Sequence, residues 1–144
     1  MNPLPHEYQV EANAADTGGV ALRADGLPTL PSAPPPEFDG PGDVWSPESL
    51  LVAAVADCFV LTFRAMARAS KLPWSSIRCR AGGTLDRVER VTRFVDMAIE
   101  AELVVPEGTR AETATRLLEK AEKGCLVTSS LDLEVRLETR IRVA

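Results

Sequence analysis

The chain has 144 residues, of which 45% are hydrophobic and 26% charged, and its formal net charge is −5. This composition predicts a single globular domain, residues 1–144, and argues against nucleic acid or an anionic membrane surface as a partner. The sequence has no uninterrupted apolar run of about 18 residues, and its first residues lack the basic and apolar parts of a signal peptide. We therefore expect no membrane span and a cytoplasmic location.

The N-terminal third combines a predicted hairpin with a long loop. Residues 8–13 place Tyr8, Val10 and Ala12 on one face, which predicts a half-buried strand. The Asp-Thr-Gly-Gly sequence at 16–19 predicts a turn, and residues 20–23 would form the returning strand. Residues 24–45 contain six prolines, and proline fixes φ and removes a hydrogen-bond donor. We expect a loop there without a regular strand or helix, of a length that is usually functional or mobile.

A long, mostly apolar helix is predicted from Pro47 to about residue 70. Ser46 is suited to the N-cap, Pro47 to the first helical position, and Glu48 to the positive end of the helix dipole. The position that completes a capping box holds Ser49 instead of Glu or Gln, so we expect the box to be incomplete. Helical spacing predicts a packed stripe that includes Cys58: Leu51, Ala54, Val55, Cys58, Thr62 and Ala65.

The second half begins with a predicted pair of strands. Residues 77–81 alternate between apolar and charged side chains, and the two glycines at 82–83 suggest a bulge. Glu89-Arg90 is a plausible tight connection to a longer strand, whose odd-numbered residues from Val95 to Val105 are expected to face one way.

A second helix and a last strand complete the chain. Thr109 and Glu112 fit a capping box, and Gly124 is expected just beyond the end of the helix. Residues 131–143 alternate cleanly, which predicts an antiparallel-type strand with one solvated face. The order β-β-loop-α-β-β-α-β favours an α+β fold with antiparallel sheets.

Three cysteines carry the candidate chemistry. There is no Cys-x-x-Cys motif and the only histidine is His6, so a disulfide scaffold and a zinc site are not expected, and no cofactor is predicted. A cysteine on an apolar face is usually part of the core, which is our interpretation of Cys79 and an alternative for Cys58. Cys125 directly follows a helix, and a new helical turn there would favour its thiolate. Cys58 and Cys125 could form a disulfide if their Cα atoms lie within about 7 Å.

Two segments carry a resemblance to a known family. The sequence SPESLLVAAVADCF, residues 46–59, is followed 67 residues after Cys58 by AEKGC, residues 121–125, and then by a closing strand. This pattern resembles the OsmC/Ohr family, the osmotically inducible and organic hydroperoxide resistance proteins. The likeness covers the chain from about Tyr8 to its end, because the order of elements also agrees.

The resemblance implies an OsmC-like fold and an intertwined homodimer with two sites at the subunit interface. It also implies a thiol-dependent peroxidase that reduces organic hydroperoxides, in which Cys58 attacks the peroxide and Cys125 resolves the product through a disulfide. A dithiol reductant, dihydrolipoamide-like or another thiol, would then restore the pair. In the family, the counterpart of Glu48 pairs with an arginine that contacts the reactive cysteine.

The chain departs from the family where that arginine is expected. One branch has arginine after two glycines, where this chain has Val20, and another has it before Phe-Glu/Asp-Gly, where this chain has Glu37. Arg23 is a candidate substitute for the missing cation. Glu48 is about 15 Å from Cys58 along one helix, so it could serve the site only across an interface or through an arginine. Glu48 could equally act only on the helix dipole.

Two alternatives remain open at this point. Without a cation, burial raises the pKa of a cysteine, which favours a catalytically weak family member that binds a small apolar ligand in the interfacial pocket. The other alternative is an α+β domain in which all three cysteines belong to the core. An apolar helix face around Cys58, formed by Val55, Phe59 and Thr62, would suit an organic hydroperoxide better than hydrogen peroxide.

Overall fold

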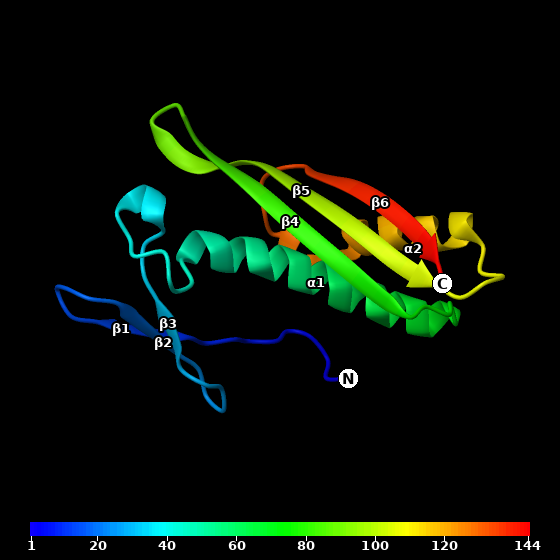
Figure 1. Ribbon diagram of the computed structural model, residues 1–144. Coiled ribbons are helices and arrows are strands. Elements are labelled where there is room, and N and C mark those ends of the chain that lie inside the picture. The colour runs from blue at the N-terminus through cyan, green and yellow to red at the C-terminus, as the bar shows by residue number, and fades with distance from the viewer. The chain divides into compact units, whose positions relative to one another are not determined.

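The computed structural model describes residues 1–144, which form two compact units, Met1–Leu50 and Leu51–Ala144. The first unit contains an antiparallel sheet of three strands in the order β1-β2-β3, visible in blue to cyan in Figure 1. The strands are β1 (Glu11–Ala14), β2 (Val20–Arg23) and β3 (Leu30–Ser32). The predicted hairpin is confirmed, since β1 pairs with β2 from Glu11 opposite Arg23 to Ala14 opposite Val20.

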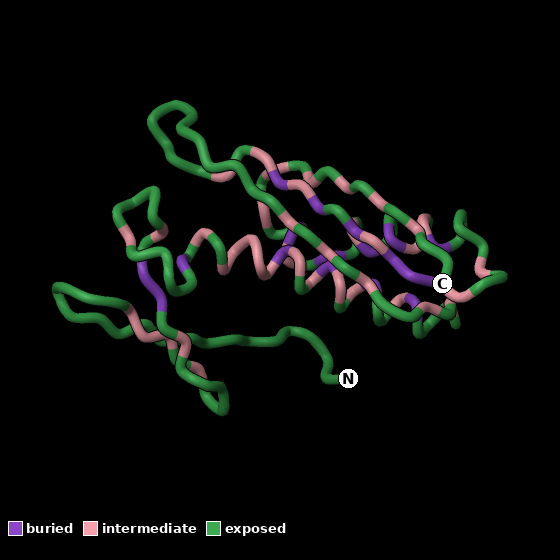
Figure 2. The backbone as a smooth tube through the Cα atoms, viewed as in Figure 1, coloured by how far each residue is buried: buried purple, intermediate pink, exposed green.

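The predicted burial of the first strand is wrong. β1 starts at Glu11, all of its residues are exposed, and Tyr8 retains 86% of its accessible surface. Figure 2 shows this hairpin as mostly exposed. Three apolar residues in alternation are too few to decide burial, and β1 is held by its backbone pairing with β2.

The proline-rich segment contains regular structure, which corrects the expectation of an unstructured loop. β3 lies within it, with Pro31 opposite Ala21, and a short 3-10 helix, η1, spans Pro36–Phe38. β3 is an edge strand, which needs ladder hydrogen bonds on one side only and therefore tolerates proline. Proline also fits the start of η1, where its missing N–H is not needed.

The long helix α1 spans Pro47–Ser70, as predicted. The backbone N–H of Ser49 donates to the Ser46 hydroxyl (3.1 Å), and the N–H of Ser46 donates to the Ser49 hydroxyl (2.9 Å). The expectation of an incomplete capping box is therefore wrong, because a serine hydroxyl accepts the bond that Glu or Gln usually accepts. These two bonds cap the start of α1.

The second unit contains a long hairpin. β4 (Ser76–Val88) and β5 (Val91–Val105) are antiparallel, and Glu89 and Arg90 both have positive φ, 50° and 69°. These values fit the two-residue turn whose twist matches a hairpin, which confirms the predicted tight connection. The register shifts between Thr84 and Leu85, one residue after the glycine pair. A bulge there confirms the irregularity that the glycines suggested.

The chain then forms α2 (Ala111–Gly124), a four-residue helix α3 (Leu126–Ser129) and β6 (Val135–Val143). β6 pairs with β5 in parallel, so the expectation of an antiparallel strand is wrong. The helices form a crossover that returns the chain in the direction of β5. The alternation of half-buried and exposed residues along most of β6 confirms its solvated face.

Two details at the ends of α2 differ from expectation. The helix begins after Arg110, without a side-chain capping bond, so Thr109 and Glu112 do not form the predicted box. Gly124 is the last helical residue and not the one beyond it. A Cβ atom on Gly124 would lie 2.9 Å from Cε of Met66 on α1, so glycine allows the two helices to approach closely here.

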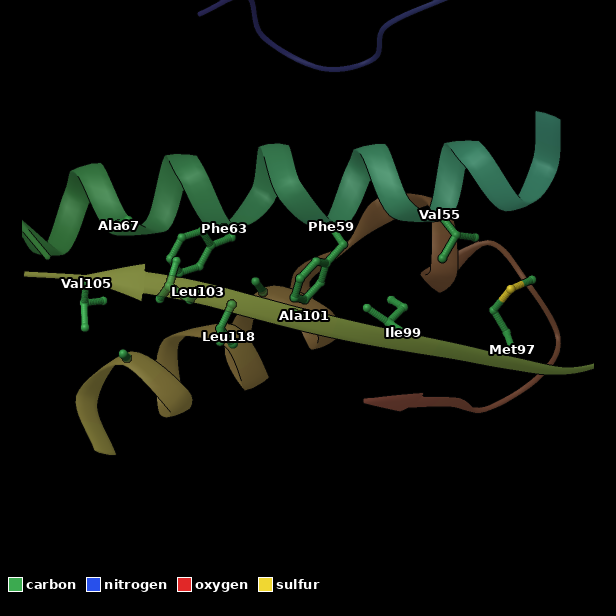
Figure 3. Packing of buried hydrophobic residues seen from close by; sticks show 12 residues of the cluster. Val55, Phe59, Phe63, Ala67, Met97, Ile99, Ala101, Leu103, Val105 and Leu118 are labelled. Atoms are coloured by element: carbon green, nitrogen blue, oxygen red, sulfur yellow. The ribbon is translucent and has the colours of Figure 1, made fainter. Parts of the chain in front are cut away.

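The core lies between both long helices and the sheet β4-β5-β6. Figure 1 shows α1 and α2 on the same side of this sheet, and Figure 3 shows the buried side chains of α1 directed at β5. The fully or nearly fully buried residues of this cluster are Val55, Phe59, Phe63, Ala67, Met97, Ile99, Ala101, Leu103, Val105, Ala114, Leu118 and Ala121.

The buried row of α1 is rotated relative to the predicted stripe. It runs through Val55, Phe59, Phe63 and Ala67, while Cys58 is only half-buried and the predicted Ala65 is exposed. The larger phenylalanine side chains take the positions directly over the sheet, because they bury the most apolar area. Cys58 therefore lies at the edge of the core.

By length and composition alone, α1 could also cross a membrane. Our expectation of no such span rested on counting an uninterrupted apolar run, which is a stricter test. Core helices of globular proteins satisfy the looser criterion as well, and one face of α1 packs on the sheet.

Candidate active site

Cys58 and Cys125 come together in the second unit, although they are 67 positions apart in the sequence. Cys58 is half-buried in the middle of α1, and Cys125 is fully buried at the junction of α2 and α3. The two thiols lie close enough that each shifts the pKa of the other. The disulfide between these two cysteines and their roles in a reaction stay predictions.

The environment of Cys58 disfavours its thiolate. Burial raises the pKa of Cys58, and the neighbouring Cys125 raises it further. The backbone N–H of Val127 and the hydroxyl of Thr62 lower the pKa of Cys58, but the net shift remains upward. Oγ1 of Thr62 lies 3.9 Å from Sγ of Cys58, one helical turn further along α1.

The environment of Cys125 favours its thiolate. Burial raises the pKa of Cys125, but the backbone N–H of Thr128, the Cys58 thiol and the Thr128 hydroxyl outweigh burial, so that the pKa is lower than usual. The expected helical turn is present, since α3 begins at Leu126 and Cys125 precedes it as N-cap. Backbone N–H groups in the first turn of a helix have no partner within the helix and can stabilise a thiolate.

The backbone at Cys125 is held by several hydrogen bonds. Its carbonyl oxygen accepts from the Ser129 N–H (3.0 Å), the Ser129 hydroxyl (2.8 Å) and the Thr128 hydroxyl (3.2 Å). Both side chains come from α3, so the short helix is tied to the residue that precedes it. This arrangement holds the backbone from which the Cys125 side chain projects.

Cys79 has a different environment. It is half-buried on β4, opposite Ala101, and burial raises its pKa to about 11. It packs against the core, which supports the structural interpretation. No group of three or more His, Cys, Asp or Glu side chains is arranged to hold a metal ion.

Arg23 and Glu48, the other two predicted site residues, belong to the first unit. Arg23 is the exposed last residue of β2, and Glu11 is its partner across the hairpin. Oε1 of Glu48 is buried without a hydrogen-bond partner in the chain. A carboxylate oxygen in that state is costly unless a donor reaches it, so Glu48 remains a candidate for a partner outside the chain. The roles of both residues stay predictions.

The apolar side chains available near Cys58 are not those expected. Val55 and Phe59 are fully buried in the core, so they cannot form a substrate surface. Ala54 and Leu61 lie about one turn to either side of Cys58 and remain partly exposed, Leu61 by 50%. The sequence reasoning also missed the Thr62 and Thr128 hydroxyls as partners of the thiols. The i, i+4 spacing of Cys58 and Thr62 was a signal that could have revealed the first of them.

Comparison with known proteins points to one family. Residues 40–140 match the family described as OsmC-like protein. Peroxiredoxin OsmC of Escherichia coli (strain K12) is 31% identical over 97 residues, which cover 67% of this chain and 67% of that protein. An uncharacterized protein of Bacillus subtilis (strain 168), YmaD, is 25% identical over 144 residues and 96% of both chains.

Solved structures share the fold at low sequence identity. An OsmC-like protein of unknown function from Vibrio cholerae has a TM-score of 0.86 and 16% identity, with 94% of this chain and 99% of that chain covered. An organic hydroperoxide resistance protein OsmC from Legionella pneumophila has a TM-score of 0.76 and 23% identity, with 97% and 99% covered. At these identities the likeness shows the fold, and it confirms the predicted α+β architecture.

Proposed function

Since the chain belongs to the OsmC-like family, we propose that it is a thiol-dependent peroxidase that reduces organic hydroperoxides. The observation that carries this proposal is that the Cys58 and Cys125 thiols lie close to each other, one on α1 and one at the start of α3. Two neighbouring thiols can turn over by forming and breaking one disulfide.

The first step is assigned to Cys58, the more accessible of the two thiols. Its thiolate attacks the distal oxygen of the hydroperoxide ROOH, the O–O bond breaks, and RO⁻ takes a proton to leave as the alcohol ROH. The sulfur is oxidised to a sulfenic acid, Cys58–SOH. The raised pKa of Cys58 makes deprotonation the limiting requirement of this step at neutral pH.

The second step is assigned to Cys125, whose lowered pKa favours a thiolate. This thiolate attacks the sulfenic sulfur of Cys58, the S–O bond breaks, and hydroxide leaves as water after taking a proton. An external dithiol, dihydrolipoamide-like or another thiol, then reduces the disulfide by exchange and becomes a disulfide itself. The sum of the steps converts ROOH and the dithiol into ROH, water and the oxidised dithiol.

The substrate class rests on the surface beside Cys58. Ala54 and Leu61 present partly exposed apolar area next to the thiol, which favours an organic hydroperoxide over hydrogen peroxide. We also propose a homodimer, because apolar residues on the open side of α1 need cover and because Oε1 of Glu48 lacks a donor. A cytoplasmic location would give the disulfide access to a reducing dithiol.

The test is a stoichiometric assay with cumene hydroperoxide and hydrogen peroxide, comparing the wild type with Cys58→Ser. The proposal predicts that the wild type consumes cumene hydroperoxide faster than hydrogen peroxide and that Cys58→Ser consumes neither. Equal, slow consumption by both proteins would contradict it. Cys79→Ser is the matched control and should react as the wild type does.

A weakly catalytic protein that binds a small apolar ligand is the second candidate. The raised pKa of Cys58 favours it, because a protonated thiol reacts slowly with peroxides. The pH dependence of Cys58 alkylation separates the two candidates. An apparent pKa above about 8.5, together with no consumption of hydroperoxide, would support ligand binding over catalysis.

A further inference from the structure

We propose that Thr62 is a positioning residue, whose hydroxyl donates a hydrogen bond to the Cys58 sulfur and holds it facing Cys125. This inference rests on the proposed peroxidase function and assigns a further residue to the same site. Thr62 follows Cys58 by one turn of α1, so both side chains lie on the same side of the helix. The distance between Oγ1 and Sγ is 3.9 Å.

The hydroxyl of Thr62 is directed at the sulfur and not at the backbone. In the middle of a helix, a threonine hydroxyl commonly bonds the carbonyl oxygen one turn earlier. Ser70 does this at the end of α1, where its hydroxyl donates to the Met66 carbonyl (2.8 Å). Thr62 instead contacts the sulfur of Cys58, so its rotamer places the hydroxyl beside the thiol.

The surroundings of the Thr62 methyl group hold this rotamer. A Cβ atom on Gly124 would lie 3.7 Å from Cγ2 of Thr62 and 2.9 Å from Cε of Met66, so the last turn of α2 lies directly against α1 at this point. A β-branched side chain has few χ1 rotamers in a helix, and the methyl group packs toward Gly124. Exchanging the two groups would place the hydroxyl against apolar atoms. Gly124 is also the residue before Cys125, so this contact lies beside both thiols.

The Thr62 hydroxyl matters because few other groups stabilise the thiolate form of Cys58. Burial and Cys125 both raise the pKa of Cys58, and Cys125 on the α3 side is the titratable group that faces it. The groups that favour the thiolate are the Val127 N–H and the Thr62 hydroxyl, and no cation is among the groups that act on it. A hydrogen bond to a charged atom is stronger than one to a neutral atom, so the hydroxyl acts mainly on the thiolate.

The test compares Thr62→Val, which keeps the shape and removes the hydroxyl, with Thr62→Ser, which keeps the hydroxyl. Peptide-resolved mass spectrometry follows iodoacetamide alkylation of each cysteine against pH, and single-turnover kinetics follow cumene hydroperoxide. We expect Thr62→Val to raise the apparent pKa of Cys58 and to slow both reactions at pH 7 by about threefold to tenfold. Thr62→Ser should lie between the wild type and Thr62→Val, since it retains the donor but lacks the methyl group that holds the rotamer.

Matched controls separate this role from a loss of structure. Alkylation of Cys79 should be unchanged in every variant, and Thr113→Val, at an exposed position of α2, should behave as the wild type. If Thr62→Val does not fold, Thr62→Ala takes its place in the comparison with Thr62→Ser. Equal alkylation profiles with and without the hydroxyl would overturn the inference. Because alkylation needs no peroxide, this result stands even if the wild type reduces no hydroperoxide and the proposed function fails.

Discussion

The surroundings of the two thiols differ in the state of the backbone. Cys58 lies in the middle of a 24-residue helix, where the backbone N–H groups are already bonded within the helix. Cys125 lies at a break between two helices, where the N–H groups of the first turn of α3 are free to face a sulfur. The pKa is raised at the first position and lowered at the second. Burial therefore dominates at Cys58, while the hydrogen-bond donors of α3 and the neighbouring thiol outweigh burial at Cys125.

Because the pKa of Cys58 is raised and that of Cys125 is lowered, the two steps should depend differently on pH. The attack by Cys58 needs a proton to leave a thiol whose pKa is raised, so its rate should still increase with pH between about 7 and 8.5. Disulfide closure uses Cys125, whose pKa is lowered, so its rate should decline only at lower pH. Stopped-flow measurement of both phases against pH checks this order. Coincident profiles, or a closure that needs the higher pH, would contradict it.

The largest expected effect comes from removing the second thiol. Cys125→Ser should abolish turnover with a dithiol reductant and let Cys58–SOH accumulate, because no neighbouring thiol can close the disulfide. The loss of the neighbour that raises the pKa of Cys58 should also lower that pKa. Trapping with dimedone and alkylation against pH measure the two effects. Undiminished turnover in this variant would show that Cys125 is not the resolving thiol.

The residues adjoining the two thiols should differ sharply in their effect on stability. Phe59 is fully buried, and Phe59→Ala should lower the free energy of unfolding by about 3–5 kcal/mol. Leu126 keeps 72% of its accessible surface, and Leu126→Ala should change the free energy of unfolding by less than about 0.5 kcal/mol. Urea denaturation measures both. Similar losses in the two variants would mean that Leu126 is covered in solution, as a dimer interface would cover it.

Gly124 lies at a close contact between α2 and α1. Gly124→Ala should reduce stability by about 1–3 kcal/mol, because its Cβ would lie 2.9 Å from Cε of Met66. Gly82→Ala is the matched control, since nothing lies within 4 Å of a Cβ at that position. Thermal denaturation compares the two. Adding Met66→Ala should recover part of the loss caused by Gly124→Ala if the steric contact is its cause.

A smaller loss than that of Phe59→Ala is expected at the start of α1. Ser46→Ala removes the hydroxyl that accepts the Ser49 N–H and should cost about 1 kcal/mol of stability. Ser46→Asp keeps an acceptor and should restore most of the loss. Denaturation of both variants, with the disulfide-forming rate as a second readout, checks whether the cap acts only on stability. A slower rate in Ser46→Ala at unchanged stability would contradict that separation.

Some features followed from the sequence because the signal was local. The limits of α1 were predictable from the Ser46-Pro47-Glu48 start, and the tight turn followed from the break at Glu89-Arg90. The alternation in β6 gave its solvated face but not its direction, because alternation is the same in parallel and antiparallel strands. Direction depends on the crossover through α2 and α3, which is a tertiary feature.

The thiol site was predictable only in part. The sequence identified Cys58 and Cys125 and the helical turn at Cys125. The proximity of the two thiols depends on how α2 packs on α1, which the sequence does not reveal. The packed stripe of α1 was misplaced because the phenylalanine side chains, not the periodic small residues, face the sheet. The low pKa of Cys125 arises from unpaired N–H groups, which side-chain identity does not reveal.

The most direct test is whether peroxide forms a disulfide between Cys58 and Cys125. The reduced protein is treated with one equivalent of cumene hydroperoxide, and the peptides are mapped by mass spectrometry without reduction. We expect one disulfide, between Cys58 and Cys125, with Cys79 remaining a free thiol. A linkage that includes Cys79, or consumption of the peroxide with Cys58 and Cys125 both still reduced, would contradict it.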